Sequence, residues 1–277
     1  MNMKLASLLR ATAVGALSLV AAGTIFPGAA NASLVLINGM TGAQLLPPTG
    51  TSAAQSFVDL GAQGFGTAPR LLTTQGSGSQ NTLTGTGVPP APGTCDAATL
   101  ATGCVTGADK TTTPTLATLG WTTGNQVALG FNSDQSGQTG ITLQALTLTI
   151  YNGTTPVGSF SLNPAYVGFT FTAADLAMEP GNGNSVFQWG LTTDEFAKFN
   201  AIVAQSGSSG FVAGLSATLG CPSPTPPGCQ VTNDGPDTWI GFVRVPGPVV
   251  GAGLPGLVMA CGALLGLARR RRQRLAS

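Results

Sequence analysis

The feature that most constrains this chain is an uncharged, apolar run near its end, from Val249 to Ala268. An α-helix rises about 1.5 Å per residue, so a run of about 20 residues crosses a hydrocarbon core of about 30 Å. Pro255 lies within the run, which lipid tolerates because the helical backbone has no other hydrogen-bond partner there. The competing reading is a buried core helix, although such a helix would show a polar face.

Basic residues follow the apolar run directly, at Arg269, Arg270, Arg271, Arg272 and Arg274. Positive charge is retained on the cytoplasmic side of a membrane. We therefore expect one transmembrane helix over residues 249–268, with the Arg cluster 269–274 in the cytoplasm and the bulk of the chain outside.

The first 32 residues have the parts of a secretory signal peptide. Lys4 and Arg10 give a positive start, residues 11–26 are apolar, and Ala30-Asn31-Ala32 forms a small-x-small cleavage site. We expect cleavage between Ala32 and Ser33. The alternative is an uncleaved membrane helix.

Two prolines stand just before the apolar run, in the motif Val245-Pro246-Gly247-Pro248. Together with the span and Arg269–Arg272, this arrangement resembles the PEP-CTERM family of sorting signals, although Gly247 stands where that family usually has Glu. The resemblance covers residues 245–277 only. It implies recognition by an exosortase, a membrane-embedded cysteine transpeptidase, and cutting near the prolines. It also implies a bacterium that makes exopolysaccharide.

Residues 33–244 are therefore expected to form the exported domain. Their charge is low and mildly acidic, because only Arg70, Lys110, Lys198 and Arg244 oppose all 10 acidic residues. The net charge of this region is about −6, and no basic patch supports nucleic-acid binding. The 40 glycines and 19 prolines of the chain suit many turns between short strands.

Alternating apolar residues predict a mainly β domain. Strands are expected at 33–38, 126–131, 141–151, 156–162, 165–171, 210–219 and 238–245. Within 141–151 the alternation changes phase, which predicts a β-bulge near Ala145. The turn at Asn152-Gly153 predicts a hairpin to 156–162, and the strands from 126 to 171 are expected to form an antiparallel meander. We predict an antiparallel β-sandwich or jelly-roll-like fold.

One helix is well indicated, beginning after Thr192. Thr192 and Glu195 match a capping box, and Phe196, Phe199 and Ile202 recur at helical spacing and should face the sheet. A shorter helical turn is expected over residues 173–178.

Four cysteines lie in the exported domain, at Cys95, Cys104, Cys221 and Cys229. An exported chain meets an oxidising compartment, so an even number indicates disulfides. Three connectivities exist, and we favour Cys95–Cys104 with Cys221–Cys229 because each closes a short loop. A zinc site is the alternative, but the chain has no histidine and neither pair has CxxC spacing.

The absence of histidine removes the Ser-His-Asp and Cys-His catalytic systems. Carboxylate pairs for glycoside hydrolysis remain at Asp175/Glu179, expected in solvent, and at Asp194/Glu195, which a helix N-terminus explains better. No catalytic residue or cofactor is predicted.

Two loops have oxygen side chains beside glycine and are weak calcium candidates; their residues are Asn132 and Asp134 in one and Asn233, Asp234 and Asp237 in the other. Ordinary turns explain the same composition. The tryptophans at 121, 189 and 239 suit a sugar-stacking platform, but each lies in an apolar run, which favours core packing.

These features favour a non-catalytic surface or extracellular-matrix protein, anchored in the inner membrane as a precursor and associated with exopolysaccharide or biofilm. The alternatives are a lectin-like or calcium-dependent carbohydrate-binding module, and a polysaccharide-acting enzyme with a carboxylate pair.

Overall fold

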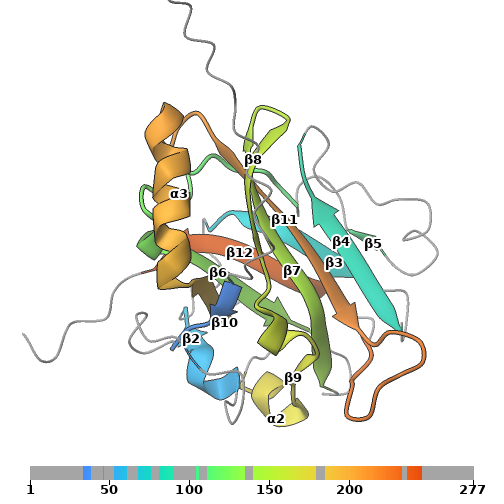
Figure 1. The fold of residues 1–277 in the computed structure, drawn as a ribbon. Helices are drawn as coiled ribbons and strands as arrows, with labels where there is room; N and C mark the ends of the chain where they lie inside the picture. Colours follow the sequence, from blue (N-terminus) through green and yellow to red (C-terminus); the bar gives the residue numbers. More distant parts are fainter. Residues whose placement is uncertain are drawn as a thin grey trace, which may run out of the picture.

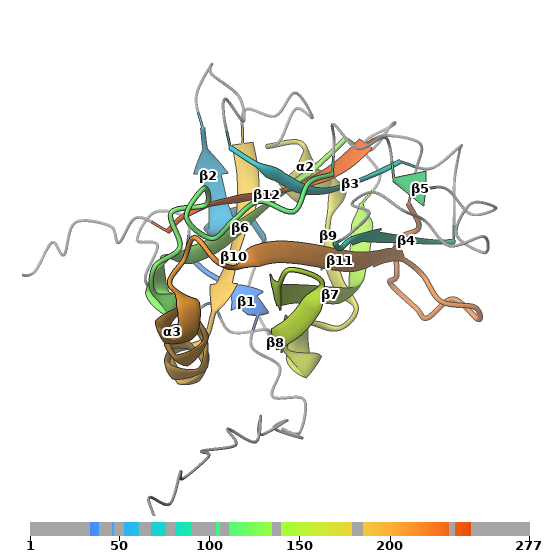
Figure 2. The same cartoon turned by 90° about the horizontal axis from the view of Figure 1, so that it is seen from above.

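Two antiparallel β-sheets stacked face to face build this protein, as Figures 1 and 2 show for the computed structural model. The structure describes residues 34–38, 46, 53–60, 68–75, 81–89, 104–105, 111–134, 140–178, 185–232 and 236–244. The expected signal peptide, the sorting motif at 245–248, the apolar run and the Arg cluster lie outside these residues. Within them, no helix has the length and hydropathy needed to cross a bilayer.

The first sheet has the strand order β1-β10-β6-β12-β3-β5, and β2 also pairs with β10. Its strands are β1 (Leu34–Leu36), β2 (Phe57–Asp59), β3 (Arg70–Gln75), β5 (Cys104–Val105), β6 (Val127–Ser133), β10 (Ser185–Leu191) and β12 (Pro236–Val243). Every residue of β6 and β10 is buried, so buried and exposed residues do not alternate along these strands.

The second sheet has the order β4-β11-β7-β8, and β9 also pairs with β7. Its strands are β4 (Thr82–Gly87), β7 (Ile141–Asn152), β8 (Thr155–Ser161), β9 (Phe169–Phe171) and β11 (Val212–Gly220). Buried and partly exposed residues alternate along β4, β7 and β11. One face of this sheet therefore lies on the core and the other is open.

The bulge predicted near Ala145 is confirmed. Thr218 of β11 stands opposite Ala145, but Leu219 stands opposite Leu143, so Gln144 is the extra residue. The bulge restores the inward direction of the apolar residues after the phase change, which keeps Leu143 and Leu146 both in the core. The hairpin is also confirmed, with β7 paired to β8 and Gly153 in the turn at φ 61°.

The predicted meander is wrong in two respects. β6 belongs to the first sheet, where it pairs with β10 and β12, and not beside β7. Residues 165–171 do not form one strand: the 3-10 helix η4 (Pro164–Tyr166) precedes the short β9. Local alternation predicts that a strand exists, but its partners depend on contacts distant in sequence.

Helix α3 (Thr193–Ser206) lies beside β8 at one edge of the two layers, as Figure 2 shows, and also contacts the 3-10 helix η2 (Gly124–Gln126). Phe199 and Ile202 are buried as predicted. Thr192 is the N-cap residue, but its side chain makes no capping bond, so the predicted capping box is wrong. A mutual capping box forms instead at α2 (Ala173–Leu176), between Thr172 and Asp175.

Aromatic side chains fill the space between the sheets. Phe131 and Trp239 of the first sheet lie 4.5 Å apart between ring centroids, and Phe131 is 5.0 Å from Phe171 of the second sheet. The 3-10 helix η1 (Ala53–Ser56) packs on β10. On the opposite side of the first sheet Gly130, Val186 and Ile240 are also buried, and the partly buried Phe242 packs there, since a Cβ at Gly130 would lie 2.9 Å from both Val186 and Phe242.

Candidate functional site

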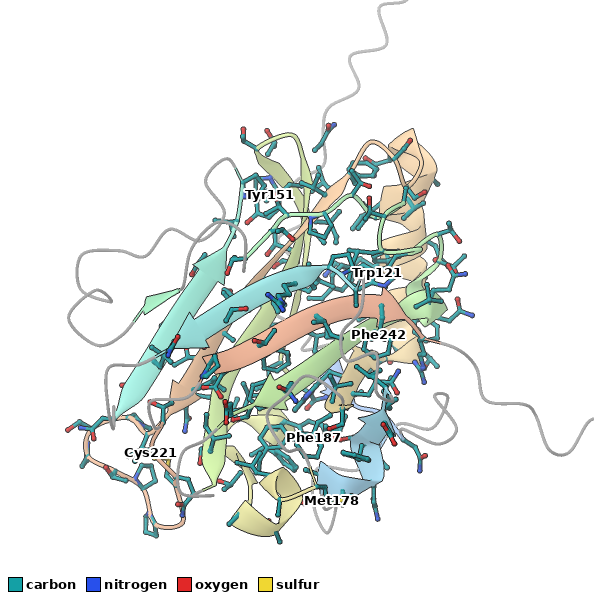
Figure 3. All side chains as sticks on the ribbon, turned by 180° about the vertical axis from the view of Figure 1, so that it is seen from behind. Trp121, Tyr151, Met178, Phe187, Cys221 and Phe242 are labelled. Carbon is teal, nitrogen blue, oxygen red and sulfur yellow. A yellow bond between two sulfur atoms is a disulfide. The ribbon has the colours of Figure 1, made fainter. Side chains whose placement is uncertain are left out.

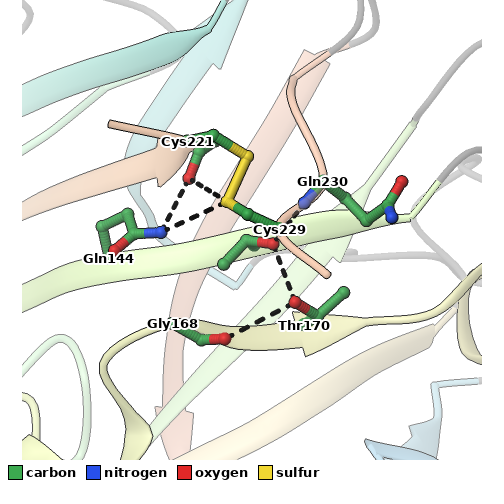
Figure 4. The surroundings of a disulfide bond; sticks show 8 residues. Gln144, Gly168, Thr170, Cys221, Cys229 and Gln230 are labelled. Atoms are coloured by element: carbon green, nitrogen blue, oxygen red, sulfur yellow. Dashed lines mark hydrogen bonds between the residues drawn. A yellow bond between two sulfur atoms is a disulfide. The ribbon is translucent and has the colours of Figure 1, made fainter. Parts of the chain in front are cut away.

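The disulfide predicted between Cys221 and Cys229 is present and closes a proline-rich loop after β11 (Figure 4). Cys95 lies outside the described residues and only the backbone of Cys104 is described, so the pairing of these two stays a prediction. An oxidised pair fits an exported chain, because thiols in a reducing cytosol remain reduced.

This loop is held against the outer side of the second sheet, where the bulge is. The side-chain amide of Gln144 donates to the Gly220 carbonyl at 3.0 Å. The Gln230 backbone N–H donates to the Thr142 hydroxyl at 2.8 Å, and that hydroxyl also bonds Thr170 at 2.8 Å (Figure 4). The residue that the bulge inserts thus holds the residue just before the loop, and Thr142 holds the residue just after it.

The carboxylate candidates have structural partners. Asp175 is only 5% exposed, not in solvent as predicted, because its Oδ2 accepts from the Thr172 N–H and hydroxyl while its Oδ1 accepts from the Ala54 N–H. Glu179 lies outside the described residues. Asp194 is exposed on the first turn of α3, and the neighbouring Glu195 is buried with its Oε2 3.6 Å from the Lys198 ammonium.

The first calcium-candidate loop follows the end of β6, and the second leads into the start of the neighbouring β12. Ser133 stands opposite Asp237, and its hydroxyl donates to Asp237 Oδ1 at 2.6 Å. The Asn132 amide donates to the Ser185 carbonyl at 2.9 Å, while the Asp134 side chain is exposed. Asn233 and Asp234 lie outside the described residues. In the part of the chain that the structure describes, no three His, Cys, Asp or Glu residues gather as metal ligands.

The tryptophans form no sugar platform, because all three are fully buried in the core. Trp121 donates its indole N–H to the Phe242 carbonyl at 2.8 Å, and the ring centroids of Trp189 and Trp239 lie 6.4 Å apart.

An array of hydroxyl groups covers the open face of the second sheet. In β4, β11, β7 and β8, the side chains that alternate with the core residues are mostly Thr and Ser. We call this surface the hydroxyl face; its hydroxyl residues are Thr82, Thr84, Thr86, Thr147, Thr149, Ser159, Ser161, Ser216 and Thr218.

One row of the hydroxyl face crosses all four strands. Thr86 stands opposite Ser216, Ser216 opposite Thr147, and Thr147 opposite Ser161. Neighbouring strands lie about 4.8 Å apart, so the row extends about 14 Å. On either side of it, hydroxyls bond each other across strands, Thr84 with Thr218 and Thr149 with Ser159, each at 3.1 Å.

Tyr151 borders the hydroxyl face at the end remote from Cys221 (Figure 3). Its ring lies over the backbone of Gly214, since a Cβ on that glycine would lie 3.0 Å from Tyr151 Cε2. The Tyr151 side chain is partly exposed, so a ligand on the hydroxyl face can reach part of it. The sequence signal for this site was the recurrence of Thr and Ser at every second position, which composition alone does not reveal.

Comparison with protein-family models, curated proteins and solved structures finds no match to this chain. Its function therefore has to be inferred from the sequence and from the geometry of the side chains.

Proposed function

We propose that this protein is an exported, non-catalytic surface or matrix protein that is sorted by its C-terminal signal and associated with exopolysaccharide. The observation that carries the proposal is the tail, in which a Pro motif at 245–248, an apolar span and an Arg cluster follow one another. A signal-peptide pattern at residues 1–32 agrees with it, and so does the disulfide Cys221–Cys229. The proposed sorting partner is an exosortase-type transpeptidase.

The domain between the two signals is proposed to be a jelly-roll-like sandwich with a binding rather than a catalytic role. Asp175 supports this, because its carboxylate is used to cap α2 and to hold Ala54. A polysaccharide-acting enzyme would need two carboxylates facing one cleft.

A lectin-like carbohydrate-binding module is the second candidate, favoured by the hydroxyl face. Threonine and serine hydroxyls both donate and accept hydrogen bonds, as sugar hydroxyls do. This candidate is compatible with the first, since a matrix protein can hold its polysaccharide through such a module.

The experiment is the intact mass and cell fractionation of the native protein, with and without Arg269–Arg272 changed to Ala. We expect the native chain to begin at Ser33, to end near Pro246 and to leave the cell, whereas the Arg-to-Ala chain should remain in the membrane. A native chain that keeps its tail in the inner membrane would overturn the sorting proposal.

A further inference from the structure

We propose that the hydroxyl face binds a neutral polysaccharide chain, laid across β4, β11, β7 and β8 along the row from Thr86 to Ser161. The inference deepens the proposed function and rests on it for the association with exopolysaccharide. It adds the place of contact and the class of glycan.

The strands of the hydroxyl face carry no charge. The strands β4, β7, β8 and β11 contain no Asp, Glu, Lys or Arg. Lys198 reaches the edge of β8, where its ammonium donates to the Ser159 carbonyl at 2.9 Å, in the plane of the sheet rather than on the face. An anionic glycan or a nucleic acid gains affinity from cationic side chains, which these strands lack. A neutral ligand does not depend on cationic side chains for its affinity, so their absence from these strands favours it over an anionic one.

The hydroxyls of the central row are accessible and make no hydrogen bond within the described part of the chain. Thr86, Ser216, Thr147 and Ser161 are partly exposed, and none of their hydroxyls bonds the described part of the chain. Each therefore has both a donor and acceptor positions open to solvent. Four such groups in one line match the repeated hydroxyls of an extended sugar chain.

The ring of Tyr151 lies next to the central row. Gly214 lies two residues from Ser216 on β11, a distance of about 7 Å along the strand, and the Tyr151 ring covers that glycine. The ring therefore lies beside the central row, and the Tyr151 side chain is partly exposed there. A flat aromatic surface next to hydroxyl groups fits the apolar face and the equatorial hydroxyls of a sugar ring.

The opposite border is the disulfide loop. Gln144 of β7 donates to the carbonyl of Gly220, the residue just before the loop, and the loop's prolines at 222, 224, 226 and 227 are exposed. The hydroxyl face thus lies between a disulfide-closed loop and an aromatic ring, and the pairing of its four strands sets the positions of its hydroxyls without a ligand. Such pre-organisation lowers the entropic cost of binding.

A second copy of this chain is a less suitable occupant. Two sheets that stack face to face bury interdigitating apolar side chains. The hydroxyl face would instead bury hydroxyls that water now satisfies, which costs free energy unless each finds a new partner.

The test uses the full-length protein in detergent and affinity electrophoresis through gels that contain dextran, galactomannan, a soluble β-1,3-glucan or hydroxyethyl cellulose, with dextran sulfate as the anionic comparison. We expect at least one neutral polysaccharide to retard the protein more than dextran sulfate does. If no neutral polysaccharide retards it, or if dextran sulfate retards it most, the proposal is wrong.

The decisive variant is Thr147→Val with Ser216→Ala. Neither hydroxyl has a protein partner in the described chain, so its removal breaks no folding contact, and an unchanged thermal unfolding midpoint checks this. We expect about tenfold weaker retardation, as the loss of two neutral hydrogen bonds implies. The matched control is Thr193→Val, an exposed threonine on α3, which should bind as the wild type does.

A second pair of variants tests the ring. Tyr151→Ala should weaken retardation about tenfold, whereas Tyr151→Phe should preserve it, because stacking needs the ring and not the phenol. If the Thr147/Ser216 variant and Tyr151→Ala both bind like the wild type, the glycan lies elsewhere. A wild-type dimer that the same variants dissociate would show self-association and also overturn the proposal.

These outcomes are separate from those of the sorting experiment. A chain that keeps its tail but binds neutral polysaccharide through Thr147 and Ser216 would refute the proposed sorting alone. A chain that is cut and exported, but that no neutral polysaccharide retards, would refute the binding surface alone.

Discussion

In the first sheet, Gly130, Val186 and Ile240 point away from the core between the layers and yet are buried, whereas in the second sheet the outward Thr147 and Ser216 are partly exposed. Both sheets share one aromatic core, so the difference lies in what their other faces meet. The face that is buried has lost its alternation in sequence, and the face that is open has kept it. The open face can thus be recognised from the polar residues that alternate with the core residues along its strands.

The largest expected difference in unfolding free energy between the two sheets comes from placing a lysine on the outer face of each. Ile240 stands opposite Gly130 and is fully buried, so Ile240→Lys buries an unpaired charge and should cost at least about 4 kcal/mol of unfolding free energy. Ser216→Lys should change it by less than about 0.5 kcal/mol. Urea denaturation measures both, and equal losses would contradict the assignment of the two faces.

The next effect concerns the loop that borders the hydroxyl face. Cys221 and Cys229 are eight residues apart, and replacing both by Ser should lower the unfolding free energy by about 2–3 kcal/mol in the chain-entropy model. Reduction of the wild type with dithiothreitol should give a similar loss. If the double-Ser variant is as stable as the oxidised protein, the loop does not restrain the unfolded chain.

A third prediction concerns pH and the core between the sheets. The Tyr166 hydroxyl is buried and donates to the Leu46 carbonyl, and burial raises the pKa of Tyr166 to about 12. Because this lies above the ordinary value of 10, the folded state holds the proton more tightly than the unfolded one. The stabilising contribution is complete below pH 10 and should fall by about 2 kcal/mol between pH 10 and pH 12.

The matched variants for this prediction are the two tyrosines of the chain. Tyr166→Phe should flatten the alkaline loss of stability, measured by urea denaturation at several pH values, and Tyr151→Phe should leave it in place. Equal slopes for the two variants would place the alkaline sensitivity elsewhere.

The smallest expected effect is at the exposed edge of the second sheet. The Lys198 ammonium bonds the Ser159 carbonyl and lies 4.9 Å from the centroid of the Phe160 ring. Lys198→Met keeps the apolar stem but removes the donor, so we expect a loss of about 0.5 kcal/mol and faster amide exchange in β8. Amide exchange in β8 at the wild-type rate in this variant would show that Lys198 does not protect the edge.

Sequence reasoning succeeded where the determining contacts are local. The helix face of Phe199 and Ile202 follows from a 3.6-residue period, and the bulge at Gln144 follows from a phase change within one strand. The pairing of Cys221 with Cys229 follows from a short loop. Each of these signals lies within a dozen residues of the chain.

The same reasoning was wrong where partners are distant. β6 and β7 are neighbours in sequence but lie in different sheets, because β6 pairs with β10 and β12 instead. Asp175 was expected in solvent, yet its carboxylate caps a helix and bonds the N–H of Ala54. The hydroxyl face forms only when four strands pair in register. Each strand by itself contributes a single line of Thr or Ser residues.

The position of β12 has a consequence for the order of folding. This strand, the last that the structure describes, lies between β6 and β3 in the first sheet and pairs with both. A chain synthesised or exported from its N-terminus therefore presents β6 and β3 as two unpaired edges until residues 236–243 arrive. Such long-range pairing slows folding, and open edges invite aggregation in the meantime. The first sheet is thus completed late, when residues 236–243 have reached the compartment that already holds β3 and β6.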